Sequence, residues 1–176
     1  MSTLKVSTIS PLGTDATKTI TIGSAGDTAA GVFTNTPMVK ARRTANQSIA
    51  NNTWVKVIWD TADVNEGSAY DTSTGTFTVP ANQGGKYQIY GLVGVGGTPD
   101  DGERVDISIY KNGSQDIYTI VQTFSPSSNT PITSQVNNIL DLSAGDYIEI
   151  YMRHNEGSSQ NLEAERNGFF VAKMIG

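Results

Sequence analysis

Short runs of alternating or continuous apolar residues recur from Pro37 to the end of the chain, and residues that favour turns separate them. Such a succession is typical of an all-β sandwich. The pattern predicts eight or more strands, for which the candidates are Val39–Thr44, Trp54–Trp59, Thr76–Val79, Tyr87–Val95, Val105–Lys111, Ile117–Phe124, Ile132–Leu142, Asp146–His154 and Phe169–Ile175.

Three segments between these runs carry turn signals. Asn112 and Gly113 both tolerate a positive φ, so the strands that flank them are predicted to pair as a hairpin. Ser143–Asp146 and Asn82–Gly85 predict two further tight turns.

Two predicted strands, Tyr87–Val95 and Phe169–Ile175, are apolar on both faces. One face of such a strand meets the core, and the other must meet something else, most simply a partner subunit. The predicted interface residues are Tyr87, Ile89, Tyr90, Phe169, Phe170, Val171 and Met174. The alternative is that both segments are central strands of a monomer.

Residues 1–36 differ from the head, residues 37–176, because they are rich in Thr, Ser, Gly and Ala, and their charges cancel. Two short alternating pieces cannot bury a core alone, so this segment is predicted to be an extended N-terminal arm that docks on another surface. The attachment residues of this arm are predicted to be Leu4, Val6, Ile9, Ile20 and Ile22.

Composition excludes several classes of protein. The 176 residues contain no cysteine, which removes disulfide frameworks and thiolate metal sites. The net charge of −5 argues against a nucleic-acid partner, since such binding needs clustered Lys and Arg. The sequence shows neither a signal peptide nor an apolar stretch long enough for membrane insertion.

No enzymatic chemistry is expected. His154 is the only histidine, and its polar neighbours predict that it caps a solvated loop at a strand end. No catalytic residue, metal site or cofactor is therefore assigned. Calcium is the one ion that the acidic clusters would suit, with Asp100 and Asp101 as the weak candidates. A solvated acidic surface is the favoured interpretation of both clusters, which are Asp60, Asp63, Glu66 and Asp71, and Asp100, Asp101, Glu103 and Asp106.

Recognition of a partner is expected in the loops, because the strands of a sandwich are committed to packing. The candidate loops are Gly96–Arg104, Ser125–Pro131 and Asn155–Asn161, although simple solvent-exposed connections are favoured over a binding surface. The candidate recognition residues are Asp100, Asp101, Arg104, Ser127, Asn129, Asn155 and Glu156.

Two tryptophans, Trp54 and Trp59, have opposite parity, so at most one of them faces the core of a regular strand. The other is an interface anchor or a platform on which a sugar stacks, and the interface is favoured.

The order of several motifs resembles the globular heads of complement-one-q proteins, which share the tumour-necrosis-factor-like (TNF-like) jelly roll. The resemblance covers residues 38–176 and rests on Trp54–Trp59, Tyr70-Asp71, Gly75–Pro80, Gly85–Ile89, Ile107–Gly113, Leu140–Ile150 and Phe169–Ile175. It implies a ten-stranded-type jelly-roll sandwich that assembles as a homotrimer.

The sequence departs from animal members of that family in having no collagen stalk of Gly-X-Y triplets. Residues 4–9 and 18–23 are similar instead to the N-termini of structural proteins from tailed bacteriophages. The resemblances together imply a non-enzymatic virion protein, displayed on the particle surface and anchored to capsid or tail proteins through residues 1–36. Its role would be shell decoration or attachment to a host-surface glycan or protein. The alternative is a cellular ligand-binding module of the same fold.

Overall fold

The computed structural model describes residues 36–96, 100–127, 131–164 and 166–174, which belong to the unit Asn35–Gly176. The predicted arm, with its attachment residues Leu4, Val6, Ile9, Ile20 and Ile22, lies outside the described residues, as does Asn129. In the described part of the chain, no helix is long and apolar enough to span a membrane.

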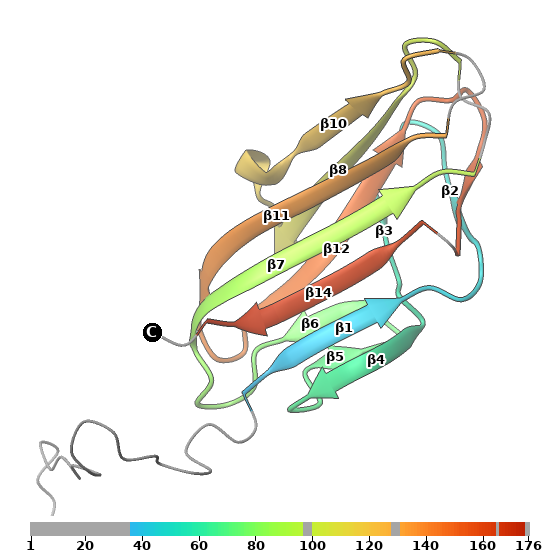
Figure 1. Ribbon diagram of the computed structural model, residues 1–176. Helices are drawn as coiled ribbons and strands as arrows, with labels where there is room; N and C mark the ends of the chain where they lie inside the picture. Colours follow the sequence, from blue (N-terminus) through green and yellow to red (C-terminus); the bar gives the residue numbers. More distant parts are fainter. Residues whose placement is uncertain (1–35, 97–99, 128–130, 165, 175–176) are drawn as a thin grey trace, which may run out of the picture. The chain divides into compact units, whose positions relative to one another are not determined.

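Two antiparallel sheets form the sandwich (Figure 1). The five-stranded sheet has the order β11 (Thr133–Leu142), β7 (Gly85–Gly94), β14 (Gly168–Lys173), β1 (Met38–Arg42) and β4 (Thr61–Glu66). The seven-stranded sheet contains β10 (Val121–Phe124), β8 (Arg104–Lys111), β12 (Tyr147–His154), β6 (Thr76–Thr78) and β5 (Tyr70–Asp71), with β3 (Val55–Lys56) on β12 and β9 (Ser114–Gln115) on β8. A separate pair joins β2 (Gln47–Ile49) to β13 (Gln160–Leu162).

The core lies between the two sheets because their strands alternate in period two. Val105, Ile107 and Ile109 of β8 point inward with Ile148, Ile150 and others. Trp59 is fully buried and stacks on Phe169, with ring centroids 4.7 Å apart. Trp54 is half-buried on the outside, so the prediction that at most one tryptophan faces the core is confirmed.

The all-β prediction is confirmed, but two of the predicted strands differ from the observed ones by three or more residues at one end. The segment Trp54–Trp59 pairs only at Val55–Lys56. The run Ile117–Phe124 divides into a 3-10 helix, η1 (Ile117–Thr119), and β10. Asp116 caps η1 by accepting a hydrogen bond from the Tyr118 backbone N–H at 3.1 Å. The strands β2, β4, β5, β9 and β13 were not predicted, since they are short or, as in β4, mostly polar.

The hairpin between β8 and β9 is confirmed in detail. Asn112 and Gly113 have φ values of 53° and 75°, which this two-residue turn requires. The Asn112 side chain also donates to Asp146 Oδ1 at 2.8 Å and accepts from the Tyr147 N–H at 2.9 Å. The hydrogen bond from Asn112 first, and then those from the Ser143 N–H and from Lys111, lower the pKa of Asp146 to about 2. The Asn112-Gly113 turn and the Ser143–Asp146 turn are therefore joined by a direct hydrogen bond, which stabilises both.

Candidate functional site

The seven predicted interface residues lie on opposite faces of the five-stranded sheet. Tyr87, Ile89, Phe169 and Val171 are at most 2% exposed and pack into the core of the single chain. They cannot contact a partner subunit, so their assignment to an interface is corrected. The other three, Tyr90, Phe170 and Met174, belong to the opposite, outer face, as the alternation along β7 and β14 requires.

The outer face of the five-stranded sheet carries an apolar band. Phe170 lies opposite Tyr90 in the register of β14 and β7. In the neighbouring row, Met38 of β1 lies opposite Ala172, and Ile139 of β11 lies opposite Gln88. We call this surface the sheet face; its apolar members are Met38, Tyr90, Leu92, Ile139, Phe170, Ala172 and Met174.

A second apolar surface follows η1 and β10 along the open edge of the seven-stranded sheet. Tyr118 is 91% exposed, Ile117 65% and Phe124 54%. We call this surface the apolar edge; its members are Ile117, Tyr118, Ile120, Val121 and Phe124. Within the described ranges, every large apolar side chain that is exposed lies on the sheet face or on the apolar edge.

Buried polar contacts hold η1 in its place at this edge. The Thr119 hydroxyl is buried, accepts from the Ile109 N–H at 2.9 Å and donates to the Asp116 carbonyl at 2.8 Å. Ser108, also fully buried, lies 3.3 Å from the same hydroxyl. The exposure of Ile117 and Tyr118 therefore follows from a fixed backbone. Sequence reasoning missed this surface, because Ile117–Phe124 has the pattern of an ordinary strand.

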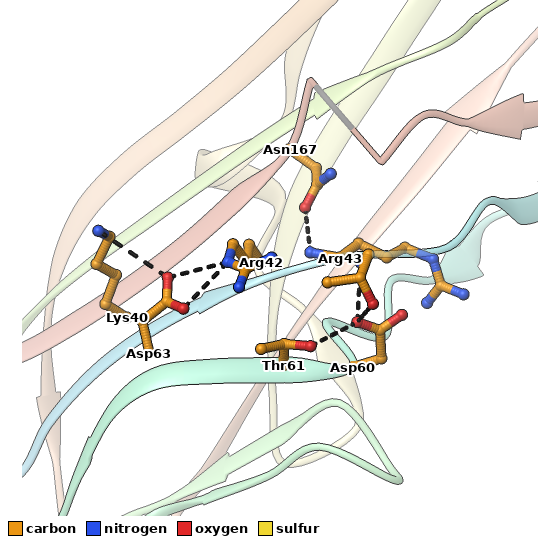
Figure 2. Close-up of polar contacts among 8 residues, drawn as sticks. Lys40, Arg42, Arg43, Asp60, Thr61, Asp63 and Asn167 are labelled. Atoms are coloured by element: carbon orange, nitrogen blue, oxygen red, sulfur yellow. Dashed lines mark hydrogen bonds and ion pairs between the residues drawn. The ribbon is translucent and has the colours of Figure 1, made fainter.

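Charged residues border the sheet face beside Tyr90 and Phe170. Figure 2 shows three of them, Lys40, Arg42 and Asp63. Arg42 Nε donates to Asp63 Oδ1 at 3.0 Å, and Lys40 Nζ lies 4.0 Å from the same carboxylate. These side chains line a hollow of about 320 Å³ together with Tyr90 and Phe170. The hollow is large enough for one aromatic side chain from another molecule.

Both residues of the basic pair Arg42-Arg43 donate hydrogen bonds to neighbouring oxygen atoms. Arg43 donates through its backbone N–H to Asn167 Oδ1 at 2.6 Å (Figure 2). Its guanidinium contacts the Ile58 carbonyl. Asp60 accepts from the Thr44 N–H at 2.9 Å and from Thr61 at 3.1 Å. Partial burial acts to raise the pKa of Asp60, but these hydrogen bonds outweigh it and lower the pKa.

Several predicted loop residues meet at one end of the sandwich. The Arg104 N–H donates to Asn155 Oδ1 at 2.7 Å, and the Asp100 N–H donates to Glu103 Oε2 at 2.6 Å. Asp101 is exposed, and the Ser127 carbonyl accepts from the Ser125 hydroxyl at 2.7 Å. Their role in recognition stays a prediction.

The second acidic cluster contains a residue that is buried and ion-paired within the fold. Asp106 lies in β8, is fully buried and pairs with Arg153 Nη2 at 2.6 Å, so the expectation of a solvated loop is wrong for this residue. In the part of the chain that the structure describes, no group of three or more acidic or histidine side chains could hold a metal ion. Asp100 and Asp101 therefore gain no support as calcium ligands.

His154 is fully buried, so the expectation that it caps a solvated loop is wrong. Its Nε2 lies 2.9 Å from the Ile49 carbonyl, and its Nδ1 lies 3.4 Å from the Glu156 N–H. A neutral ring with the proton on Nε2 satisfies both contacts. His154 thus joins β12 to the β2–β13 pair.

Glu156 is partly buried, and its Oε1 has no hydrogen-bond partner among the residues that the structure describes. Burial, and then the negative charge of Glu103, raise the pKa of Glu156 from 4.5 to about 7. The raised pKa means that the ionised carboxylate destabilises the fold. This cost is absent below pH 4.5 and appears as the pH rises toward 7.

We therefore expect Glu156→Gln to raise the free energy of unfolding at pH 8 by about 1 kcal/mol, a figure discounted for solvent screening, with little change at pH 4.5. Urea unfolding at the two pH values and one protein concentration measures this difference. Glu66→Gln, which changes an exposed carboxylate of β4, is the matched control. Equal effects of the Glu156 substitution at both pH values would contradict the argument.

The two stacked antiparallel sheets, with this strand order and this buried core, define a jelly-roll β-sandwich. The family model for the C1q domain matches residues 39–171, and the chain belongs to this family. The family is non-enzymatic, so the expectation that the chain is not an enzyme is confirmed. Its domains, like those of the TNF proteins, typically homotrimerise.

Solved structures share the fold at low sequence identity. The globular domain of zebrafish complement 1qA protein has a TM-score of 0.55 and 14% identity and covers 79% of this chain and 98% of its own. Eiger TNF from S. frugiperda has a TM-score of 0.57 and 11% identity, with coverages of 80% and 94%. Murine APRIL has a TM-score of 0.54 and 14% identity, with coverages of 78% and 98%. No curated protein matches the sequence.

Proposed function

We propose that the chain is a homotrimeric, non-enzymatic module in which the apolar edge of each subunit packs on the sheet face of the next. The observation that carries this proposal is that the exposed large apolar residues of the described chain gather on these two different surfaces. Water contact with such surfaces is unfavourable, and their burial in an assembly removes that cost.

The pairing of two unlike surfaces is compatible with a cyclic trimer, the assembly that is typical of the family. A contact between different patches is heterologous, and it generates a closed ring when the rotation between subunits closes. Each subunit then uses both of its apolar surfaces, and none stays open at the end of the assembly. Phe124 or Tyr118 of one subunit fits the hollow beside Tyr90 and Phe170 of its neighbour in size and chemistry.

The trimer is proposed to act as a surface-displayed structural protein of a phage virion. The similarity of residues 4–9 and 18–23 to phage structural proteins supports this placement. In this proposal residues 1–36 bind a capsid or tail protein, and the loops of the head decorate the shell or contact a host glycan or protein. A cellular ligand-binding module is the second candidate, favoured by the typical role of C1q domains in recognition.

A chain that begins at Thr36 tests the role of the arm. We expect it to stay folded and trimeric, because the described core and both apolar surfaces lie after that residue. It should also lose the ability to cosediment with phage particles that lack this protein, whereas the full chain binds them. Loss of the fold would make residues 1–35 part of the domain, and cosedimentation of the shortened chain would contradict an attachment arm. Failure of the full chain to bind any particle would favour the cellular module.

A further inference from the structure

The outer face of the seven-stranded sheet carries an aromatic cluster that the proposed trimer does not use. Tyr110 and Tyr151 stack with ring centroids 3.9 Å apart, and the centroid of Trp54 lies 6.4 Å from that of Tyr110. The guanidinium of Arg153 lies 5.0 Å from the centroid of the Trp54 ring. All three rings are half-buried, so part of each stays open to solvent.

A polar hollow of about 390 Å³ adjoins this cluster. Strand β12 joins the two, because its residues Tyr147, Glu149, Tyr151 and Arg153 alternate onto the same outer face. The hollow is rich in hydroxyl groups, and its lining residues are Lys56, Asp71, Thr74, Thr76, Thr78, Tyr147 and Glu149. Donors and acceptors therefore lie next to aromatic carbon.

Glu149 is the fixed polar group of the hollow. It is only 8% exposed, and its Oε1 accepts from Lys56 Nζ at 3.0 Å and from the Thr76 hydroxyl at 3.2 Å. Lys56 itself lies opposite Tyr151 in the register of β3 and β12. The charged groups of the hollow are thus oriented by the sheet before any ligand arrives, which reduces the ordering cost of binding.

The charges on this face neutralise one another. Lys56 pairs with Glu149, and Arg153 pairs with the buried Asp106 at 2.6 Å, while Arg104 lies 3.3 Å from the same carboxylate. Asp71 is held by the Ser73 N–H at 2.8 Å and by the Ser73 hydroxyl at 2.6 Å. An anionic ligand needs cations without acidic partners, so this face suits an uncharged ligand.

We propose that this face binds a neutral glycan, with a hexose ring against Trp54 and Tyr151 and the next hydroxyls in the hollow. A pyranose presents C–H groups on its faces and hydroxyls at its edge, which match aromatic carbon beside paired polar groups. The inference rests on the proposed function in one respect: a trimer formed through the sheet face and the apolar edge leaves this third surface accessible.

Isothermal titration of the full chain with maltoheptaose, cellohexaose and an N-acetylglucosamine hexamer tests the proposal. We expect at least one of these neutral oligosaccharides to bind with a Kd of about 1 mM or tighter, and a heparin hexasaccharide not to bind. Absence of binding by all three neutral probes would overturn the proposal. Heparin binding that depends on Trp54 would overturn the assignment to a neutral ligand.

Matched variants locate the bound sugar. We expect Trp54→Ala to weaken binding about tenfold or more and Thr78→Val about threefold, because Thr78 is an exposed hydroxyl of the hollow. Ser48→Ala removes an exposed hydroxyl of β2 outside this face and should leave the affinity unchanged. Undiminished binding by Trp54→Ala would place the sugar elsewhere and contradict the proposal. Light scattering on the same samples measures the mass of the assembly separately. A failure of the proposed trimer is therefore distinguished from a failure of glycan binding.

Discussion

We expect the Phe124→Glu variant to be a folded monomer of 18.7 kDa. Phe124 is 54% exposed in the subunit, so a carboxylate there costs little in the folded monomer. In the trimer the same carboxylate would be buried against Tyr90 and Phe170, and the nearby Lys40 and Arg42 are already paired with Asp63, so its burial costs about 3–5 kcal/mol at each contact. Light scattering measures the mass, and circular dichroism checks the fold.

Two further variants sharpen this result. Phe170→Glu places the charge on the sheet face and should also yield a monomer, whereas Ser48→Glu, at an exposed position of β2, should leave the trimer intact. A mixture of the Phe124→Glu and Phe170→Glu chains retains one intact pair of surfaces. It should form a heterodimer of about 37 kDa, twice 18.7 kDa, because a heterologous contact needs only one surface from each chain. A trimeric Phe124→Glu chain would contradict the proposed contact.

Phe169→Ala is expected to lower the free energy of unfolding by about 3–5 kcal/mol, since it leaves a cavity in a close-packed core. The Phe169 ring is 2% exposed, stacks on Trp59 and lies 5.4 Å from the Tyr70 ring centroid. Chemical unfolding in the monomeric Phe124→Glu background measures the loss without a contribution from assembly.

The neighbouring residue is the matched control for this measurement. Phe170→Ala in the same background should cost less than about 1 kcal/mol, because its ring lies on the outer face of the isolated subunit. In the chain with an intact Phe124, by contrast, it should weaken the trimer. Similar losses for Phe169→Ala and Phe170→Ala in the monomer would show that the two faces of β14 are not distinguished as described.

Much of the fold could be predicted because local and tertiary signals agree. The alternation along β7 and β14 is strong enough to show two apolar faces, and Asn112-Gly113 has one favoured conformation in a short hairpin. The 3-10 helix η1, by contrast, could not be predicted from the local sequence. Its helical turn depends on Thr119 reaching the distant Ser108 and Ile109, which no local pattern reveals.

The sequence predicts the apolar strands of the candidate site but not which of their faces is buried, because that depends on residues far away along the chain. Parity shows that Phe169 and Phe170 point to opposite faces, but it does not say which face meets the second sheet. That choice follows from partners far along the chain, such as Trp59 against Phe169. The buried position of His154 likewise depends on Ile49, which is 105 residues away in the sequence.

The mass of the unmodified chain in solution tests the central claim most directly. Light scattering at micromolar concentration should give about 56 kDa, three times 18.7 kDa, because each subunit covers the apolar surfaces of its neighbours. A stable mass of 18.7 kDa at that concentration, or a dimer of about 37 kDa, would contradict a closed ring of three subunits.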